Sequence, residues 1–333
     1  MLLKNASRKT GLQQFLIILL ALFALIKLFF EEKDVASIGN FISLFGNSFV
    51  EIYDKYFIFI KLITYIFYIG NAIILIYILR KHKLIELHKY YPAFFYVLFF
   101  LVFLKSTLLI PLFINTLILL FLLPTFLIIS EKNYKQQYGF IFGLFCGLIM
   151  LIYAPFLFFF LLIYLVLIIN GFYDWKNYIM PLLGLLITYI YFFSTLYLFD
   201  YKSYTYLFYF YFDQFTFLPF HFACINPFQI IIYSCIFVFY VLFSYLLFSK
   251  ASKMNIFIRK KYYFLLLGSL FGLFFSFLLI DYQYIGILFF ISILSAMGGI
   301  CESLIKKRIF YNILIFIFII AILLDYFSRY FYA

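Results

Sequence analysis

Charge is scarce in this sequence. Of its 333 residues, 11% are charged and 68% are hydrophobic, whereas a soluble domain is about a quarter charged and about half apolar. A chain of this composition folded in water would expose more apolar surface than a monomer tolerates. The shortage of charge therefore excludes a cytosolic enzyme, a nucleic-acid reader and a disordered protein. It predicts an all-α, polytopic bundle of transmembrane helices.

Tryptophan and cysteine are also scarce. A single Trp stands beside 54 Phe and 33 Tyr, although selection for ring chemistry or interfacial anchoring would favour Trp as well. We therefore attribute the aromatic content to an AT-rich genome and assign no function to any one Phe or Tyr. The 4 cysteines are scattered without a C-x-x-C pair, so the sequence supports neither a metal site nor a disulfide framework.

Long apolar segments follow one another along the whole chain. The full-length ones suit the roughly 20 residues that cross the hydrocarbon core of a membrane. The segments 139–153 and 156–170 are short, and they predict either two short spans or one re-entrant unit. We expect one integral membrane domain over residues 1–333 with about eleven crossings, at 12–30, 57–79, 91–104, 107–130, 139–153, 156–170, 179–199, 228–249, 264–280, 284–301 and 309–327.

The few charges predict an orientation. If the N-terminus is cytoplasmic and the segments alternate, 18 of the 25 basic residues fall on the cytoplasmic side, and 9 of the 13 acidic residues fall on or near the outer side. This asymmetry follows the positive-inside rule and predicts an N-in, C-out topology. The basic loops would also contact anionic lipid of the inner leaflet. Lys27 and Lys61 lie within spans, close enough to the outer ends to snorkel.

Two predicted outer loops are large enough to hold chemistry, and the first covers about 31–56. It opens with Glu31, Glu32 and Asp34, and it continues with the apolar spacing of an interfacial amphipathic helix. Three carboxylates in four residues suit a hard divalent cation, or one of them suits a general base. The ordinary alternative, favoured about two to one, is that acidic residues flank the outer end of a helix.

The second outer loop covers about 200–227 and mixes aromatic residues with Asp200, Lys202, Asp213 and His221. His221 shares this loop with two carboxylates, so the three side chains are candidates for substrate binding. A solvated or interfacial histidine is the more frequent outcome, at roughly three to one.

Polar residues inside the predicted spans are costly in lipid and usually line a cavity. They form a further set of candidates: Asn71, Asn115, Thr116, Thr188, Ser276 and Ser292. Three glycines spaced four apart predict close packing of one helix face against a neighbour. They are Gly139, Gly143 and Gly147.

Two resemblances to known families follow from these segments. The stretch NAIILIYILRKHKLIELHKYYPAFFYVLFF and the segments after it, over about residues 70–195, resemble an uncharacterised family of Bacteroidetes inner-membrane proteins. That family implies a place in the bacterial cytoplasmic membrane and no activity.

The arrangement as a whole is similar to the GT-C superfamily of membrane glycosyltransferases, which have an acidic first outer loop, interfacial helices and many helices behind them. The block 115–191 also resembles their middle region. The chain departs from the superfamily because it lacks a large soluble outer domain. The resemblance implies a catalytic or metal-binding role for Glu31, Glu32 or Asp34, and lipid-phosphate contacts for Lys55, Lys105 and Lys202.

The sequence supports two hypotheses of function almost equally. The favoured one is a non-enzymatic subunit or scaffold of a cell-envelope complex for secretion, lipid handling or surface assembly. It predicts a packed bundle without a deep polar cavity and an apolar lateral face for a protein partner. The alternative is a GT-C-like glycosyltransferase that uses a polyprenyl-phosphate-linked donor at the outer face of the inner membrane. It predicts one outward-facing cavity that holds the first-loop acids, the Asp200–His221 loop and a lysine.

The partners and cofactors expected are few. Membrane lipid is a partner under both functions, and nucleic acid is a partner under neither. No cofactor is expected, apart from a divalent cation at Glu31, Glu32 and Asp34 if the protein is an enzyme. A transporter is disfavoured because no repeats and no chain of intramembrane acids are evident.

Overall fold

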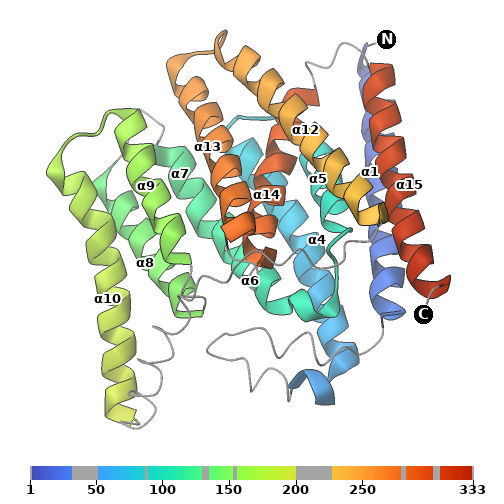
Figure 1. The fold of residues 1–333 in the computed structure, drawn as a ribbon. Coiled ribbons are helices and arrows are strands. Elements are labelled where there is room, and N and C mark those ends of the chain that lie inside the picture. Colours follow the sequence, from blue (N-terminus) through green and yellow to red (C-terminus); the bar gives the residue numbers. More distant parts are fainter. Residues whose placement is uncertain are drawn as a thin grey trace.

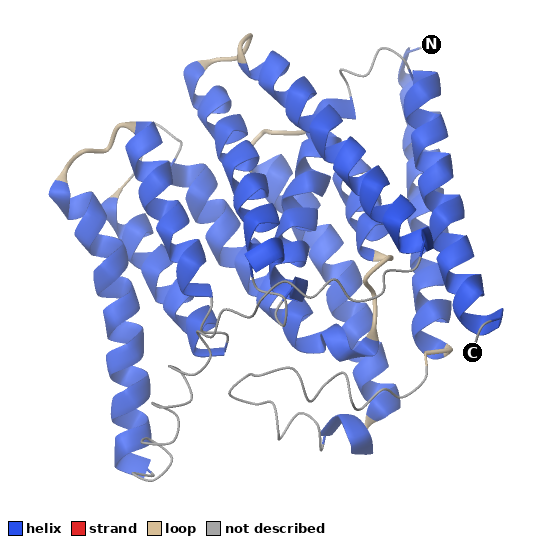
Figure 2. Ribbon diagram, viewed as in Figure 1, coloured by secondary structure: helices blue, strands red, loops and turns tan. Residues whose placement is uncertain are grey.

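The computed structural model describes residues 2–31, 52–86, 89–129, 135–152, 156–199, 227–278, 283–302 and 308–331. These residues form helices, with no strand among them (Figures 1 and 2). The α-helices are α1 Leu2–Phe29, α4 Phe57–Lys81, α5 Tyr91–Phe100, α6 Leu109–Leu117, α7 Leu123–Ile129, α8 Gln136–Ile152, α9 Leu157–Asn170, α10 Trp175–Phe199, α12 Pro227–Ala251, α13 Ile256–Leu278, α14 Gln283–Cys301 and α15 Arg308–Phe331. A 3-10 turn, η1 Ser106–Leu108, precedes α6, and a π turn, η2 Ile118–Leu122, joins α6 to α7.

The predicted all-α class is confirmed for the described residues, and the helices follow the predicted apolar segments closely. Four helical segments are long and apolar enough to cross a membrane: Phe57–Lys81, Leu109–Ile129, Trp175–Leu198 and Ile230–Ala251. Six further apolar helical segments of the described residues are shorter, among them Gln13–Phe29 within α1 and Asn312–Tyr326 within α15. The count of eleven crossings and the N-in, C-out topology therefore stay predictions. Helix α1 begins and α15 ends at opposite ends of the bundle (Figure 1).

Helix α5 lies at the centre of the bundle. Every residue of α5 after Tyr91 is buried, and the helix packs against α14, α4 and α1. Its ten residues span about 15 Å, half of the ~30 Å hydrocarbon core. The predicted crossing at 91–104 is thus a short helix enclosed by protein, where irregular backbone beyond its end is tolerated.

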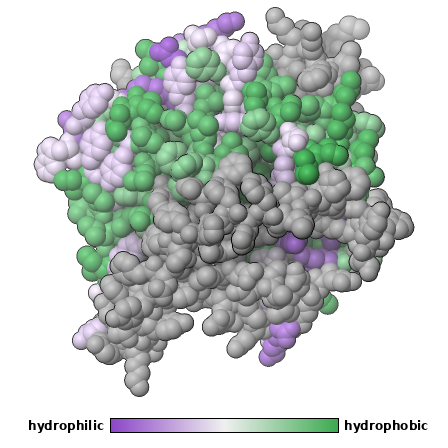
Figure 3. Space-filling model, in the orientation of Figure 1, coloured by the Kyte–Doolittle hydropathy of each residue, from purple (hydrophilic) through white to green (hydrophobic). Residues whose placement is uncertain are grey.

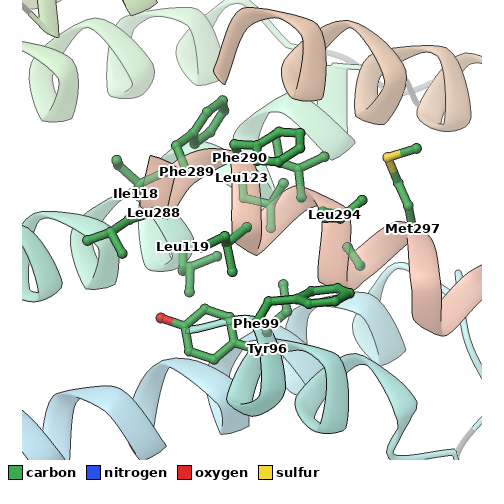
Figure 4. Close-up of a cluster of buried hydrophobic side chains, with 14 of the residues drawn as sticks. Tyr96, Phe99, Ile118, Leu119, Leu123, Leu288, Phe289, Phe290, Leu294 and Met297 are labelled. Carbon is green, nitrogen blue, oxygen red and sulfur yellow. The ribbon is translucent and has the colours of Figure 1, made fainter. Parts of the chain in front are cut away.

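Large side chains from distant helices fill the core around α5 and α14. Tyr96 and Phe99 of α5 face residues of α14 and of the 118–123 segment (Figure 4). The Phe99 ring also lies edge-on to Phe239 of α12 and Phe318 of α15, with centroid distances of 5.3 and 5.6 Å. Such edge-to-face pairs add to the burial of apolar area. These rings hold the bundle together.

The predicted apolar segment 107–130 is a continuous helical rod with one π turn in its middle. The Leu123 N–H donates to the Ile118 carbonyl, five residues back. Pro124 follows at once, and its ring would clash with the carbonyl four residues back in a regular α-helix. The wider π turn relieves that conflict and keeps the rod unbroken.

Glycines bring α8 and α10 into backbone contact. A Cβ on Gly143 would overlap the backbone carbonyl of Pro181, and a Cβ on Gly147 would lie 2.9 Å from the Cβ of Thr188. From the other side, Gly184 meets the Phe140 carbonyl in the same way. The predicted close packing is confirmed at Gly143 and Gly147.

The predicted short segments 139–153 and 156–170 correspond to two separate short helices, α8 and α9.

The exterior of the bundle is apolar. Hydrophobic residues cover much of the described surface visible in Figure 3, and hydrophilic residues lie toward its upper and lower ends. Exposed large side chains lie on several helices, including Phe15, Ile58, Ile190, Phe237 and Phe316. Such a surface is expected where lipid rather than water is the solvent.

Candidate functional site

The predicted outer site is described only in part. Glu32, Asp34, Asp200, Lys202, Asp213 and His221 lie outside the described residues. Glu31 follows the end of α1, and its backbone oxygen accepts a hydrogen bond from Lys61 Nζ at 2.6 Å. Lys55 lies just before α4 with its Nζ 5.4 Å from the Tyr56 ring centroid. Lys105 precedes η1, which packs against α4.

Glu31, Lys55 and Lys105 therefore lie at the same end of the bundle, opposite the start of α1 (Figure 1). A groove of about 220 Å³ opens there between α1 and α4. Its walls are apolar apart from Lys61, and none of the three predicted residues lines it. Within the described ranges, no three His, Cys, Asp or Glu side chains are grouped so as to hold a metal ion.

Three of the polar residues predicted to line a cavity, Asn71, Asn115 and Ser292, are buried inside the bundle, where they bond to one another, to a tyrosine or to backbone, and Asn71 Oδ1 has no hydrogen-bond partner among the described residues. Asn115 Nδ2 of α6 donates to the Tyr96 hydroxyl at 3.0 Å, and Ser292 Oγ of α14 donates to Asn115 Oδ1 at 3.0 Å. Asn71 Nδ2 of α4 donates to the Leu112 carbonyl at 3.2 Å. All four side chains are buried. In an apolar medium such bonds fix which helices pair and in what register.

The other polar candidates bond to helix backbone. Thr116 and Ser276 donate to the carbonyls four residues before them in their own helices. Thr188 Oγ1 lies 3.2 Å from the Leu144 carbonyl, across the α8–α10 contact. These side chains thus satisfy their hydroxyls within the fold.

A strongly charged concave surface lies at the end of the bundle where α1 begins. This basic pocket, of about 490 Å³, is formed by the loop after α4, the end of α12, the start of α13 and the end of α14. Among the described residues, its charged lining consists of Arg80, Lys83, Lys89 and Lys250, with Glu86 as the one carboxylate. The volume falls in the range of small-ligand sites.

The pocket is held in place by contacts among its own walls. Lys250 Nζ donates to the Ile300 carbonyl at 3.2 Å and lies 5.9 Å from the Tyr262 ring centroid. Arg80 donates to the Lys89 carbonyl at 3.3 Å and packs over the Tyr90 ring at 4.7 Å. Gly299 allows α14 to pack directly against the start of α5 at the base of the pocket, because a Cβ at this position would overlap Pro92.

Several lysines also bind the carboxyl ends of helices, where backbone carbonyls have no partner within the helix. Lys27 and Lys61, which were expected to snorkel, donate instead to carbonyls that follow α5 or end α1. On the opposite side, Lys250, Lys260 and Lys261 donate to carbonyls at the ends of α14, α9 and α4. A cation at the negative end of a helix dipole is also favourable. The lysines thus stabilise helix ends in addition to any role in topology.

Sequence reasoning missed two parts of this arrangement. Tyr96 was set aside with all other tyrosines, and nothing local distinguishes it because its partner Asn115 comes from another helix. The pocket cations were assigned to topology and to general contact with anionic lipid of the inner leaflet, and not to a common pocket. Their clustering within 80–89 was visible, but the approach of Lys250, far along the chain, depends on the packing of α12 and α14.

No protein-family model, no curated protein and no solved structure matches this chain. The resemblances to the Bacteroidetes family and to the GT-C superfamily therefore stay predictions.

Proposed function

We propose that this chain is a multi-pass protein of the bacterial cytoplasmic membrane that serves as a non-enzymatic subunit or scaffold of a cell-envelope complex. One observation carries the proposal. Asn71, Tyr96, Asn115 and Ser292, buried among the described helices, bond to one another or to backbone, although Asn71 Oδ1 has no hydrogen-bond partner there, and none of the four lines the groove or the basic pocket. A transporter or an enzyme would present such groups to a substrate cavity.

Helix α10 supplies the lateral face that a scaffold needs. Of its most apolar window, 17% is buried, compared with 67% for the rod Leu109–Ile129. One side of α10 packs on α8, and its other side exposes large apolar residues such as Leu186 and Ile190. Close helix association in a membrane rests on packing of this kind of surface.

The test is the size of the assembly in the native membrane. The protein is extracted with a membrane-solubilising polymer and its mass is measured by native mass spectrometry. We expect a discrete assembly larger than the monomer. The double variant Leu186→Trp/Ile190→Trp, which adds bulk to the exposed side of α10, should release the monomer. The matched control is Ile66→Trp/Ile73→Trp, which adds the same bulk to an exposed side of α4.

Two results would contradict the scaffold. One is a wild-type protein that is monomeric in the native membrane. The other is an assembly that survives both pairs of substitutions, because the α10 face would then have no part in it.

A GT-C-like glycosyltransferase is the second candidate, and one observation favours it. Glu31 lies beside Lys61, and Lys61 lines the groove between α1 and α4, whose apolar walls suit a hydrocarbon chain. Under this alternative, the purified protein transfers sugar from a polyprenyl-phosphate donor, and Glu31→Gln abolishes the transfer. Glu86→Gln, at the other end of the bundle, is the control. A wild-type protein without transfer activity would eliminate this candidate.

A further inference from the structure

We propose that the basic pocket formed by Arg80, Lys83, Lys89 and Lys250 binds the phosphate headgroup of an anionic phospholipid. The site is independent of the proposed function, since it lies at the other end of the bundle from Glu31 and away from α10 (Figure 1). The charge distribution predicts this end to be cytoplasmic, where anionic lipids supply a negative surface.

The first support is an excess of positive charge in a concave site. Four cations line the pocket against one carboxylate, Glu86. That carboxylate pairs with Lys89 at 3.0 Å. Arg80 and Lys250 have neutral backbone carbonyls as their described hydrogen-bond acceptors, which leave the two charges uncompensated. The guanidinium and ammonium groups of the lining residues are the donors that a phosphate oxygen suits.

The second support is the backbone of Lys83. Its φ is +56°, and it is the only non-glycine residue with a positive φ in the described part of the chain. The left-handed region costs an ordinary residue about 1–2 kcal/mol, and strain of this kind collects at functional sites. Glycine is the usual residue there. A lysine at this position brings a cation to the pocket at the expense of stability.

The third support identifies the ligand as a lipid rather than a free phosphate. Five of the twelve described residues that line the pocket have aliphatic or thioether side chains: Leu84, Ile85, Met254, Ile258 and Ile300. A free anion would gain nothing from these side chains. The glycerol and upper acyl carbons of a phospholipid would bury apolar area against them, at roughly 25 cal/mol per Å². Basic pockets between helices at the cytoplasmic side of a membrane are suited to such headgroups.

The test measures lipid retained by the purified full-length protein in detergent, by native mass spectrometry. Phosphatidylglycerol is the anionic lipid, and phosphatidylcholine with the same acyl chains is the neutral reference. Wild-type protein should retain phosphatidylglycerol preferentially. Lys83→Gly/Lys89→Gln should weaken that binding about 25-fold, since each cation contributes about fivefold. Glu86→Gln should strengthen it.

The control is Lys81→Gln/Lys253→Gln, which removes two exposed lysines from the same end of the bundle outside the pocket lining. Its affinity for phosphatidylglycerol should be unchanged. Thermal unfolding checks the pocket variant, because glycine suits the backbone at position 83 and the fold should be retained.

Three results would overturn the proposal. Equal losses in the two double variants would show diffuse attraction of lipid to a basic surface. Equal retention of the two lipids would show that charge has no part. Displacement of phosphatidylglycerol by millimolar inorganic phosphate or glycerol phosphate would show a site for a soluble anion, without use of the apolar wall.

Discussion

Helices α4 and α9 end on the same side of the bundle with the same hydrogen bonds but with different residues at the turning position. In both, the residue with positive φ donates three residues back, from Lys83 to Arg80 and from Gly171 to Ile168, and the next residue donates five back, from Leu84 to Leu79 and from Phe172 to Leu167. This is the Schellman motif. The turning residue is Gly171 after α9, with φ +77°, and Lys83 after α4, with φ +56°.

The two ends are also held by neighbouring residues of α13. Lys260 Nζ donates to the carbonyl of Asn170, the last residue of α9, at 3.0 Å. Lys261 Nζ donates to the carbonyl of His82, the cap of α4, at 3.4 Å. The motif and the capping lysine are therefore matched, and the turning residue differs. The end that carries the strained lysine is the end that borders the basic pocket. The Schellman motif and the capping lysine, which both ends share, belong to the fold, whereas the lysine at position 83 belongs to the pocket.

The largest expected effect comes from removing the shared feature. Lys260→Met/Lys261→Met should lower the free energy of unfolding by about 3 kcal/mol, since a hydrogen bond from a charged group is worth about 1.5–3 kcal/mol. Unfolding of the purified protein by a denaturing detergent measures the change. Lys253→Met is the control, because Lys253 is exposed on the same hairpin, and it should change stability by less than about 0.5 kcal/mol.

The single variants then test whether each cap is local. The only Trp of the chain is Trp175, which begins α10 shortly after the end of α9. Its fluorescence should change in Lys260→Met and stay the same in Lys261→Met. Equal changes in the two would mean that the α13 lysines act on the bundle as a whole and that the two ends are not independent.

The next effect comes from making the ends alike. Gly171→Lys should destabilise the protein by about 1–2 kcal/mol through the left-handed backbone. Space is not the obstacle, because a Cβ on Gly171 would meet only the Tyr173 ring, at 3.9 Å. Gly171→Asn should cost less, since Asn tolerates this conformation. If thermal unfolding shows equal losses for Lys and Asn, the cost has another origin than the backbone.

The ends of α4 and α9 also show how far the sequence could be read. The apolar segments 57–79 and 156–170 were predicted within two residues of Phe57–Lys81 and Leu157–Asn170, because an apolar run and its charged or glycine flank are local signals. The lysines that cap these two helix ends could not be predicted from the sequence. Lys260 and Lys261 are separated from Asn170 and His82 by long stretches of chain, and only packing of α13 brings them together.

The candidate site divides in the same way. The expectation that Glu31, Lys55 and Lys105 lie on the outer side of a membrane rests on alternation of the helices and stays a prediction. Their geometry with Asp200, Asp213 and His221 stays a prediction, since these residues lie outside the described ranges. Asn71, Asn115 and Ser292 were identified as buried polar residues. Whether they face a cavity or one another depends on helix rotation, which apolar runs of this kind leave undetermined.

A smaller effect of opposite sign is expected at the end of α4. Lys83→Gly should stabilise the protein by about 0.5–1 kcal/mol, because relief of the left-handed strain exceeds the added freedom of glycine in the unfolded chain. The same substitution removes a pocket cation and should weaken binding of phosphatidylglycerol. Thermal unfolding and lipid retention, measured on one preparation, should therefore move in opposite directions. A variant that lost both would indicate that Lys83 supports the fold and that the strain has no link to the pocket.

The smallest effect on stability is expected from Glu86→Gln, together with a clear effect on binding. In the Glu86–Lys89 ion pair the Glu86 side chain is exposed. Because exposed pairs of this kind contribute about 0.2–0.5 kcal/mol to stability, the unfolding temperature should hardly change. Binding of anionic lipid should rise, because the pocket loses the one carboxylate of its described lining. Asp174→Asn, the matched loss of an exposed carboxylate beside the end of α9, should change neither quantity, since Asn also suits the residue before a helix. If Asp174→Asn raised lipid binding as much as Glu86→Gln, the attraction would belong to the whole surface, and the difference between Lys83 and Gly171 would need another cause than the pocket.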